Sequence, residues 1–316
     1  MAESQVRVAV VGMGEGGRGW AALCTAYGWP VTIYDNDSAA MHAAREEITE
    51  RARGLPVLLG VDPEDVEAGV SALREGRSLL QACGEAEWVI EAIQEDLIAK
   101  QKLFEGLESA APRARVASSS SATFTPQDIA ARCRRRDRVL VAHPQQPTEL
   151  IPLVELLTAP ETEGLVAELV KGWLRALGRI PVTLKKPVPG NIGGRMAAAV
   201  WREAVQLVLD GVIDVDDLDR AVSVGPGLAW AAAGPHLALH LAAGRRGTGG
   251  HVHVMLQRLE PVWRELATWD HISPRDQQRL IAAIERAYAG QTEEIRQARD
   301  RRLAAILQAL ESSRRG

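Results

Sequence analysis

The chain has 316 residues, of which 46% are hydrophobic and 25% charged, the proportions of a soluble globular protein. A formal net charge of -4 gives no electrostatic basis for binding nucleic acid or a membrane surface. We find no apolar run near the roughly 20 residues that span a bilayer. The polar first residues leave no room for a signal peptide, so we expect a cytoplasmic protein.

The first half of the chain alternates short apolar runs with amphipathic stretches, the pattern of βαβ units and a mostly parallel sheet. We expect strands over Val6–Val11, Val31–Tyr34, Trp88–Ala92, Arg115–Ser118, Val139–Ala142 and Ile180–Leu184. Helices are expected over Gly17–Tyr27, Ser38–Arg53 and Pro63–Arg74. The fold class is therefore α/β, with an N-terminal Rossmann domain followed by an all-α C-terminal domain.

The segment Lys185–Gly190 contains two prolines and a glycine, which end the last strand. We place the domain boundary there, with the Rossmann domain over residues 1–187 and a helical domain over residues 188–316. Helical periodicity marks Ile192–Asp210, Val215–Val224 and Gln277–Ser313, and Arg245–Gly250 is expected to be a glycine-rich loop. The apolar faces of these helices exceed what one layer can bury, which favours a homodimer.

A glycine-rich turn follows the first strand and opens the first helix. Gly12 allows the tight turn, Gly14 lets a pyrophosphate approach the backbone, and Gly17 lets the helix pack closely on the strand. Asp35 ends the second strand, 18 residues after Gly17. A carboxylate there accepts hydrogen bonds from the adenosine ribose and repels a 2′-phosphate, which predicts NAD rather than NADP as the cofactor.

Five further motifs occur in chain order. They are Gly17–Ala21, Val89–Leu97 with Lys100 after it, Ala117–Ser121, His143–Pro147 followed by Pro152–Leu156, and Gly225–Trp230. With them the chain resembles the 3-hydroxyacyl-CoA dehydrogenase superfamily, and within it the branch of L-gulonate 3-dehydrogenase (lambda-crystallin) and L-carnitine dehydrogenase. The resemblance implies a small hydroxy or keto acid substrate and a homodimer formed through the C-terminal domain. It places Glu95 and Lys100 beside the ribose and nicotinamide of the cofactor, and Ser121 against the substrate.

Oxidation of a secondary alcohol needs a base for the hydroxyl proton, and histidine suits this because its pKa lies near working pH. His143 follows a predicted strand, at the sheet edge where ligands bind in open α/β folds. Glu155, twelve residues later, is expected to hydrogen-bond the far imidazole nitrogen and fix the tautomer. Ser121 is expected to donate to the substrate oxygen.

The chain also departs from the family pattern. Gly194 stands where the motif P-G-F-x-x-N-R has its catalytic asparagine, and Asn191 is the amide available nearby. In H-P-F-N-P the middle residues have become Gln145 and Gln146. Ala229 replaces an arginine that the small-acid branch often carries, and Arg245 or Arg246 is a candidate to supply that charge. These changes suggest an atypical substrate.

Two alternatives remain open at this point. The first is a true 3-hydroxyacyl-CoA dehydrogenase, with Arg45, Arg51 and Arg53 as anchors for coenzyme A. The second is a non-catalytic, crystallin-like NAD-binding protein, which the loss of the asparagine favours and the retention of His143 opposes. His236 and His240 have helical i, i+4 spacing but no evident third ligand, so we expect no metal site.

Overall fold

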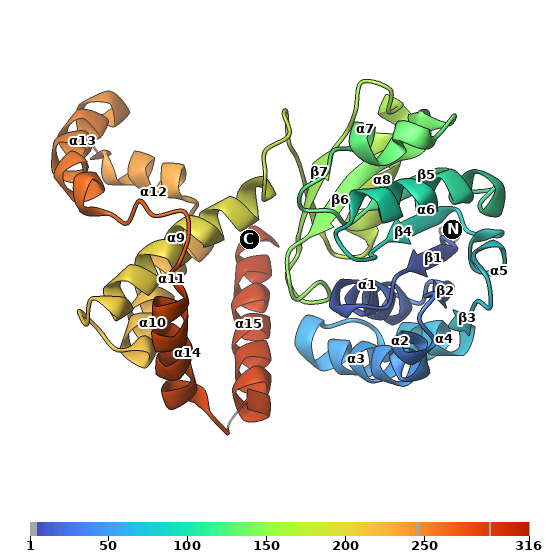
Figure 1. Cartoon of the computed structure of the whole chain (residues 1–316), viewed down its shortest axis with the longest axis horizontal. Helices are drawn as coiled ribbons and strands as arrows, with labels where there is room; N and C mark the ends of the chain where they lie inside the picture. The colour runs from blue at the N-terminus through green and yellow to red at the C-terminus, as the bar shows by residue number, and fades with distance from the viewer. Residues whose placement is uncertain (1–4, 245–246, 291, 316) are drawn as a thin grey trace. The chain divides into compact units, whose positions relative to one another are not determined.

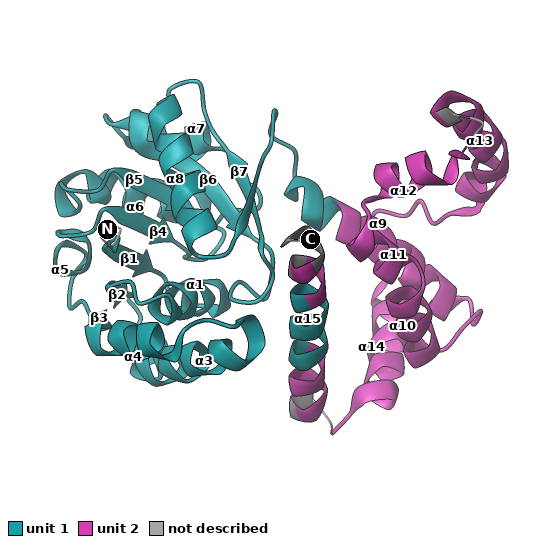
Figure 2. Ribbon diagram, turned by 180° about the vertical axis from the view of Figure 1, so that it is seen from behind, with its two compact units in different colours: residues 1–195, 300–308 teal, residues 196–299, 309–316 magenta. Residues whose placement is uncertain are grey.

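The computed structural model describes residues 5–244, 247–290 and 292–315. They form two compact units, shown in different colours in Figure 2. The first comprises residues 1–195 and 300–308, and the second residues 196–299 and 309–316. Both units share helices α9 (Asn191–Leu209) and α15 (Thr292–Arg315). The expected domain boundary between residues 187 and 188 stays a prediction.

The first unit contains a single eight-stranded sheet in the order β3-β2-β1-β4-β5-β6-β7-β8. Neighbouring strands are parallel except for β6 and β7, which are antiparallel. The strands are β1 (Val8–Val11), β2 (Val31–Tyr34), β3 (Arg74–Glu75), β4 (Trp88–Glu91), β5 (Val116–Ser119), β6 (Val139–Pro144), β7 (Leu153–Leu157) and β8 (Ile180–Thr183). Figure 1 shows the central strands between helices on both sides. The predicted Rossmann-type α/β fold is confirmed.

The central strands are mostly apolar because both of their faces are buried. Alternate residues of β1 belong to two apolar clusters. Val8 and Val10 belong to the first cluster, and Ala9 and Val11 belong to the second. The first cluster is covered by α1 (Glu15–Ala26) and α8 (Gly164–Ala176). The second is covered by α5 (Leu79–Cys83), α6 (Leu97–Ala110) and α7 (Pro126–Ile129).

Four tryptophans form the centre of the first cluster. The ring of Trp88 on β4 lies 5.9 Å from that of Trp20, 6.4 Å from that of Trp29 and 5.6 Å from that of Trp173, measured between centroids. Trp88 Nε1 donates to Ser118 Oγ at 2.9 Å, and Trp20 Nε1 donates to Ser120 Oγ at 3.1 Å. Both indole nitrogens are therefore satisfied by the same segment, which is the end of β5 and the residue after it.

A second helical layer packs against α1 within this unit. It is formed by α2 (Ser38–His42), α3 (Ala44–Leu59) and α4 (Pro63–Ala72), and it buries Ala52, Leu55 and Val66. The sequence predicted one helix in place of α2 and α3. It also missed strand β3, which consists of two residues that are both exposed, and strand β7.

All elements of the second unit that the structure describes are helical. They are α9, α10 (Val215–Val224), α11 (Pro226–Ala232), α12 (Pro235–Ala242), α13 (Gly247–Glu265), α14 (Pro274–Tyr288) and α15. The expected helices over 192–210 and 215–224 are confirmed. The helix expected over 277–313 is instead two helices, because the chain turns at Gly290, whose φ is +78°. Residues 247–250 of the expected glycine-rich loop belong to α13, and Arg245 and Arg246 lie outside the described residues.

Within the described ranges, none of the helices has the length and apolar character needed to cross a membrane.

Gly17 provides a direct test of the contact between α1 and β1. A Cβ at Gly17 would lie 1.8 Å from the carbonyl oxygen of Gly12, so Gly17→Ala must force the helix away from the strand. We expect a loss of about 2 kcal/mol or more in the free energy of unfolding, measured by urea denaturation. The control is Gly172→Ala on α8, where a Cβ meets no atom within 4 Å and should stabilise the helix by up to about 1 kcal/mol. Equal effects of the two substitutions would contradict the close packing.

Candidate active site

The turn after β1 has the geometry of a dinucleotide cradle. Gly12 has a φ of +102°, and a Cβ there would lie 2.6 Å from the carbonyl carbon of Ala92, so only glycine fits. Gly14 is the N-cap of α1, and a Cβ built on it would meet no atom within 4 Å. Open space therefore lies above a helix N-terminus whose amide groups attract phosphate. These residues fit the pyrophosphate of NAD.

Asp35 lies at the end of β2, beside this turn. One of its carboxylate oxygens accepts a hydrogen bond from Met13 N at 2.7 Å, and the other accepts from Asp37 N at 2.9 Å. Asp35 also lines a cavity of about 550 Å³. The other residues around that cavity are Tyr34, Asn36, Ser38, Met41, His42, Glu75, Gly76 and Arg77. The carboxylate is thus fixed next to a space that suits the adenosine half of the cofactor.

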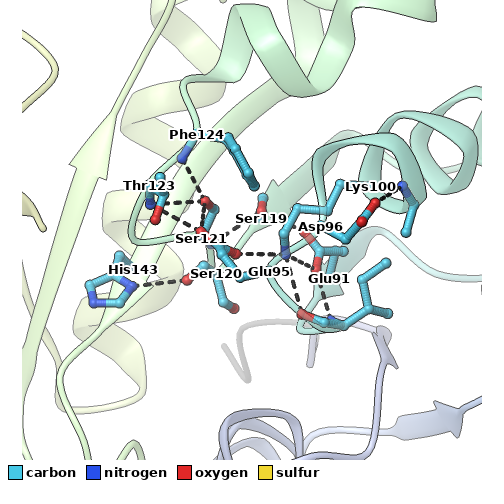
Figure 3. Close-up of polar contacts among 12 residues, drawn as sticks. Glu91, Glu95, Asp96, Lys100, Ser119, Ser120, Ser121, Thr123, Phe124 and His143 are labelled. Atoms are coloured by element: carbon cyan, nitrogen blue, oxygen red, sulfur yellow. Dashed lines mark hydrogen bonds and ion pairs between the residues drawn. The ribbon is translucent and has the colours of Figure 1, made fainter. Parts of the chain in front are cut away.

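A buried ion pair lies beyond the end of β4 (Figure 3). The ammonium of Lys100 contacts Glu91 Oε1 at 2.7 Å and Glu95 Oε2 at 3.2 Å. Burial raises the pKa of Glu91, although Lys100 and the hydroxyl of Ser119 both act to lower it. Burial also acts to raise the pKa of Glu95, but its hydrogen bond from Ser121 and the charge of Lys100 outweigh this and hold that pKa below its usual value. Glu95 is accordingly a carboxylate at neutral pH.

The hydroxyl of Ser121 makes several hydrogen bonds in the turn that follows β5. Its hydroxyl donates to Glu95 Oε1 at 2.5 Å and accepts from Thr123 N at 3.1 Å and Phe124 N at 2.8 Å. Figure 3 shows these contacts converging on the hydroxyl group. They indicate that Ser121 positions Glu95. Its expected contact with the substrate oxygen stays a prediction.

His143 lies near the end of β6, and its imidazole is held by the backbone. Nδ1 lies 2.9 Å from the carbonyl oxygen of Ser120 (Figure 3). A carbonyl oxygen can only accept, so Nδ1 must carry a hydrogen. In the neutral ring Nε2 is then unprotonated and is the basic atom. The geometry thus prepares His143 to take up a proton at Nε2.

Glu155 lies directly opposite His143 in the β6–β7 pair and is 2% exposed. Its Oε1 accepts from Ile192 N at 2.7 Å and from Gly193 N at 3.3 Å, in the first turn of α9. Among the described residues, His143 hydrogen-bonds Ser120 and not Glu155. The expected orienting bond from Glu155 to the imidazole is therefore replaced by the Ser120 carbonyl, and Glu155 instead binds the positive end of α9.

Asn191 opens α9 in a conformation that is uncommon for a residue with a side chain. Its φ is +51°, it is 5% exposed, and its Nδ2 has no hydrogen-bond partner. A Cβ built on Gly194 would meet no atom within 4 Å, so the position of the missing asparagine is open. Gln145 Oε1 is likewise buried without a partner. Unpaired buried polar atoms thus gather in this part of the site.

Two residues of this site are not evident from the motifs in the sequence. Glu91 has a recognisable signal, since it is a charged residue that ends the apolar run Trp88–Ile90. Ser120 contributes its backbone carbonyl, which no side-chain pattern can reveal.

Models of both domains of one enzyme family match the chain. The 3-hydroxyacyl-CoA dehydrogenase NAD binding domain matches residues 7–187, and the 3-hydroxyacyl-CoA dehydrogenase C-terminal domain matches residues 190–281. The chain belongs to the 3-hydroxyacyl-CoA dehydrogenase family. Its cofactor is accordingly NAD, as Asp35 predicted.

Relatives of the chain match between four fifths and nearly all of its length. An L-carnitine dehydrogenase from Nocardiopsis dassonvillei is 32% identical over 314 residues, which cover 98% of this chain and 92% of that enzyme. An L-carnitine dehydrogenase from Streptomyces griseus is 34% identical over 251 residues, covering 79% and 72%. The crystal structure of 5-formyl-3-hydroxy-2-methylpyridine 4-carboxylic acid 5-dehydrogenase, an NAD⁺-dependent dismutase, is similar with a TM-score of 0.81 and 27% identity, covering 97% of this chain and 99% of that one.

The arginines considered as coenzyme A anchors are all engaged within the first unit. Arg51 forms ion pairs with Glu15 at 2.8 Å, Glu47 at 2.5 Å and Glu149 at 3.2 Å. Arg53 pairs with Glu67 at 2.8 Å, and Arg45 donates to the carbonyl oxygen of Leu73 at 2.9 Å. Arg51 is thus held by three carboxylates and Arg53 by one at the surface, whereas Arg45 has a backbone carbonyl and no carboxylate partner among the described residues.

The cysteines add no chemistry to the site. All three thiols are buried, and burial raises the pKa of Cys83 to about 12 and that of Cys133 to about 11. Both therefore stay protonated and unreactive at neutral pH. Among the described residues, no three His, Cys, Asp or Glu side chains gather as a metal site requires.

Asp35→Asn tests the placement of the adenosine ribose. The amide keeps an oxygen that can accept from Met13 N but loses the negative charge, so binding of NADH should weaken and repulsion of the 2′-phosphate of NADPH should fall. We expect the ratio of the NADPH to the NADH dissociation constant to drop about tenfold or more, measured by fluorescence titration. Asp37→Asn, which changes an exposed helix cap two residues later, is the matched control. An unchanged ratio in Asp35→Asn would contradict the assignment.

Proposed function

We propose that this NAD-dependent oxidoreductase interconverts a small 3-hydroxy acid and its 3-keto form, with His143 as the general base. The observation that carries the proposal is the bond between His143 Nδ1 and the Ser120 carbonyl, which in the neutral ring leaves Nε2 as the nitrogen without a hydrogen. The L-carnitine dehydrogenases among its relatives act on a small free hydroxy acid, which supports the substrate class.

In the proposed reaction, His143 Nε2 takes the hydroxyl proton from the substrate as the carbinol carbon loses a hydride. Bound NAD supplies the nicotinamide carbon that accepts this hydride. The imidazolium that forms keeps its Nδ1 bond to Ser120, so the ring does not need to reorient during the reaction. The buried carboxylate of Glu155, opposite His143 on the neighbouring strand, is a negative charge that favours this imidazolium. In the reverse direction the same nitrogen returns the proton.

We assign Asn191 as the residue that donates a hydrogen bond to the substrate oxygen. Its unpartnered Nδ2 is a hydrogen-bond donor in the part of the site where Gly194 provides none. A preorganised donor of this kind contributes about 10²–10³ to the rate in comparable sites. We assign the side of the site that contacts the ribose and nicotinamide of the cofactor to three linked residues, Lys100, Glu95 and Ser121.

Two observations support this proposal over the alternatives. Arg51, one of the cations that a coenzyme A site would use, is held by Glu15, Glu47 and Glu149. A non-catalytic role would not require the fixed tautomer of His143.

We also propose that the protein is a homodimer and that it is cytoplasmic. The helices of the second unit expose large apolar side chains, which favours burial against a second copy. Examples are Trp201 at 54%, Trp230 at 46% and Trp263 at 49% exposure.

His143→Asn tests the base directly. The variant removes the proton acceptor but keeps a polar side chain, so kcat for oxidation of a 3-hydroxy acid should fall by about 10²–10⁴ while the affinity for NADH stays unchanged. The measurement is NADH absorbance with a panel of 3-hydroxy acids, alongside acetoacetyl-CoA in the reducing direction. His271→Asn, at an exposed position in the second unit, is the control. Turnover of acetoacetyl-CoA alone, or full activity in His143→Asn, would overturn the proposal.

A further inference from the structure

Gln145 carries a buried hydrogen-bond acceptor that no residue satisfies. It lies two residues after His143, and its backbone N donates to the carbonyl oxygen of Leu153 at 3.1 Å, so the pairing of the two strands continues past the end of β6. Alternate residues of a strand point to the same face, which places Gln145 on the side of His143. Its Oε1 is buried and has no donor among the described residues.

A second acceptor, Glu155 Oε2 on β7, lies beside it and faces the first turn of α9. A Cβ built on Gly193 would lie 2.5 Å from Gln145 Oε1 and 3.4 Å from Glu155 Oε2. The contact of Glu155 Oε2 with Gly193 N is long, at 3.4 Å. Two acceptor oxygens thus converge on the volume that a side chain at position 193 would fill. Glycine at that position is what leaves room for the Gln145 carboxamide.

Buried acceptors without a donor are rare in folded proteins, and each one calls for a partner. Here the partner must be a donor, because both oxygens accept. The carboxylate of Glu155 makes an O–H or a positively charged N–H group the favoured one. Glu155 is paired with His143 across β6 and β7, and Gln145 follows His143 by two residues, so both acceptors belong to the strands that carry the base.

We propose that Gln145 is a specificity-determining residue: together with Glu155 it accepts a hydrogen bond from a hydroxyl or primary ammonium group on a carbon next to the carbinol of the substrate. The inference rests on the proposed function, because His143 defines where the carbinol lies. A site that hydrogen-bonds such a group rejects analogues that lack it, since its own buried acceptor is then left unpaired. A trimethylammonium group has no N–H, so carnitine is disfavoured even though L-carnitine dehydrogenases are relatives.

The test uses four acids that differ only in the group on C4. They are 3-hydroxybutyrate with hydrogen, 3,4-dihydroxybutanoate with hydroxyl, 4-amino-3-hydroxybutanoate with ammonium, and carnitine with trimethylammonium. A fifth acid, 2,3-dihydroxybutanoate, places the hydroxyl on the other neighbouring carbon. Each is titrated into the enzyme–NADH complex, where a hydroxy acid cannot react, and its dissociation constant is read from the change in NADH fluorescence. Binding is therefore measured independently of turnover.

We expect at least one acid with a hydroxyl or ammonium donor to bind tenfold or more tightly than both 3-hydroxybutyrate and carnitine. Gln145→Met, which preserves the shape of the side chain but removes the amide oxygen, should abolish this preference. Gln127→Met, on the exposed surface of α7, should keep it. If Gln145→Met loses NADH binding through misfolding, the isosteric Gln145→Glu should strengthen binding of the ammonium acid relative to the hydroxyl acid.

The inference would be overturned by equal dissociation constants for all the acids or by absence of binding by all of them. A preference that survives unchanged in Gln145→Met would overturn it as well. Oxidation of a 3-hydroxy acid by an enzyme without any such preference would leave the proposed function standing. If the acids bind with a clear preference but none of them is oxidised in the presence of NAD, the result would count against the proposed function and not against this inference.

Discussion

The carbonyl oxygen of Ser120 holds the imidazole of His143, and the core of the sheet holds Ser120. The hydroxyl of Ser120 accepts a hydrogen bond from Trp20, whose ring packs against Trp88, and Trp88 in turn donates to Ser118 on β5. Close-packed aromatic rings have few alternative arrangements, so this segment has little freedom to shift. The orientation of the proposed base is therefore a consequence of core packing and does not require a carboxylate partner.

Charges near the site are compensated in two different ways. Glu91 is buried with the ammonium of Lys100, whereas Glu155 is buried against the amides that open α9. Either arrangement offsets the cost of removing a carboxylate from water. The amide groups of Asn191 and Gln145 contrast with them, because each has a buried atom without a partner. The fixed charges thus form the frame of the site, and the unpaired amides are the part that remains for a substrate to satisfy.

The sequence predicted the fold and the cofactor turn well, because both depend on local patterns. Apolar runs buried on two faces gave the central strands, and the spacing of Gly12, Gly14 and Gly17 gave the turn. Strand β7 was missed because its residues pair with β6 in an antiparallel arrangement that periodicity alone does not indicate. The partner of His143 was missed for a different reason. A backbone carbonyl leaves no trace in the residue types, and a spacing of twelve residues to Glu155 indicates proximity in a strand pair but not a hydrogen bond.

The central claim, that the Ser120 carbonyl fixes the tautomer of His143, is open to direct measurement. Nitrogen NMR of the imidazole groups distinguishes a protonated from an unprotonated ring nitrogen, and comparison with His143→Asn assigns the signals of His143. In the complex with NADH at a pH where the ring is neutral, the account predicts a hydrogen on Nδ1 and a free Nε2. A hydrogen on Nε2 in that complex would contradict it.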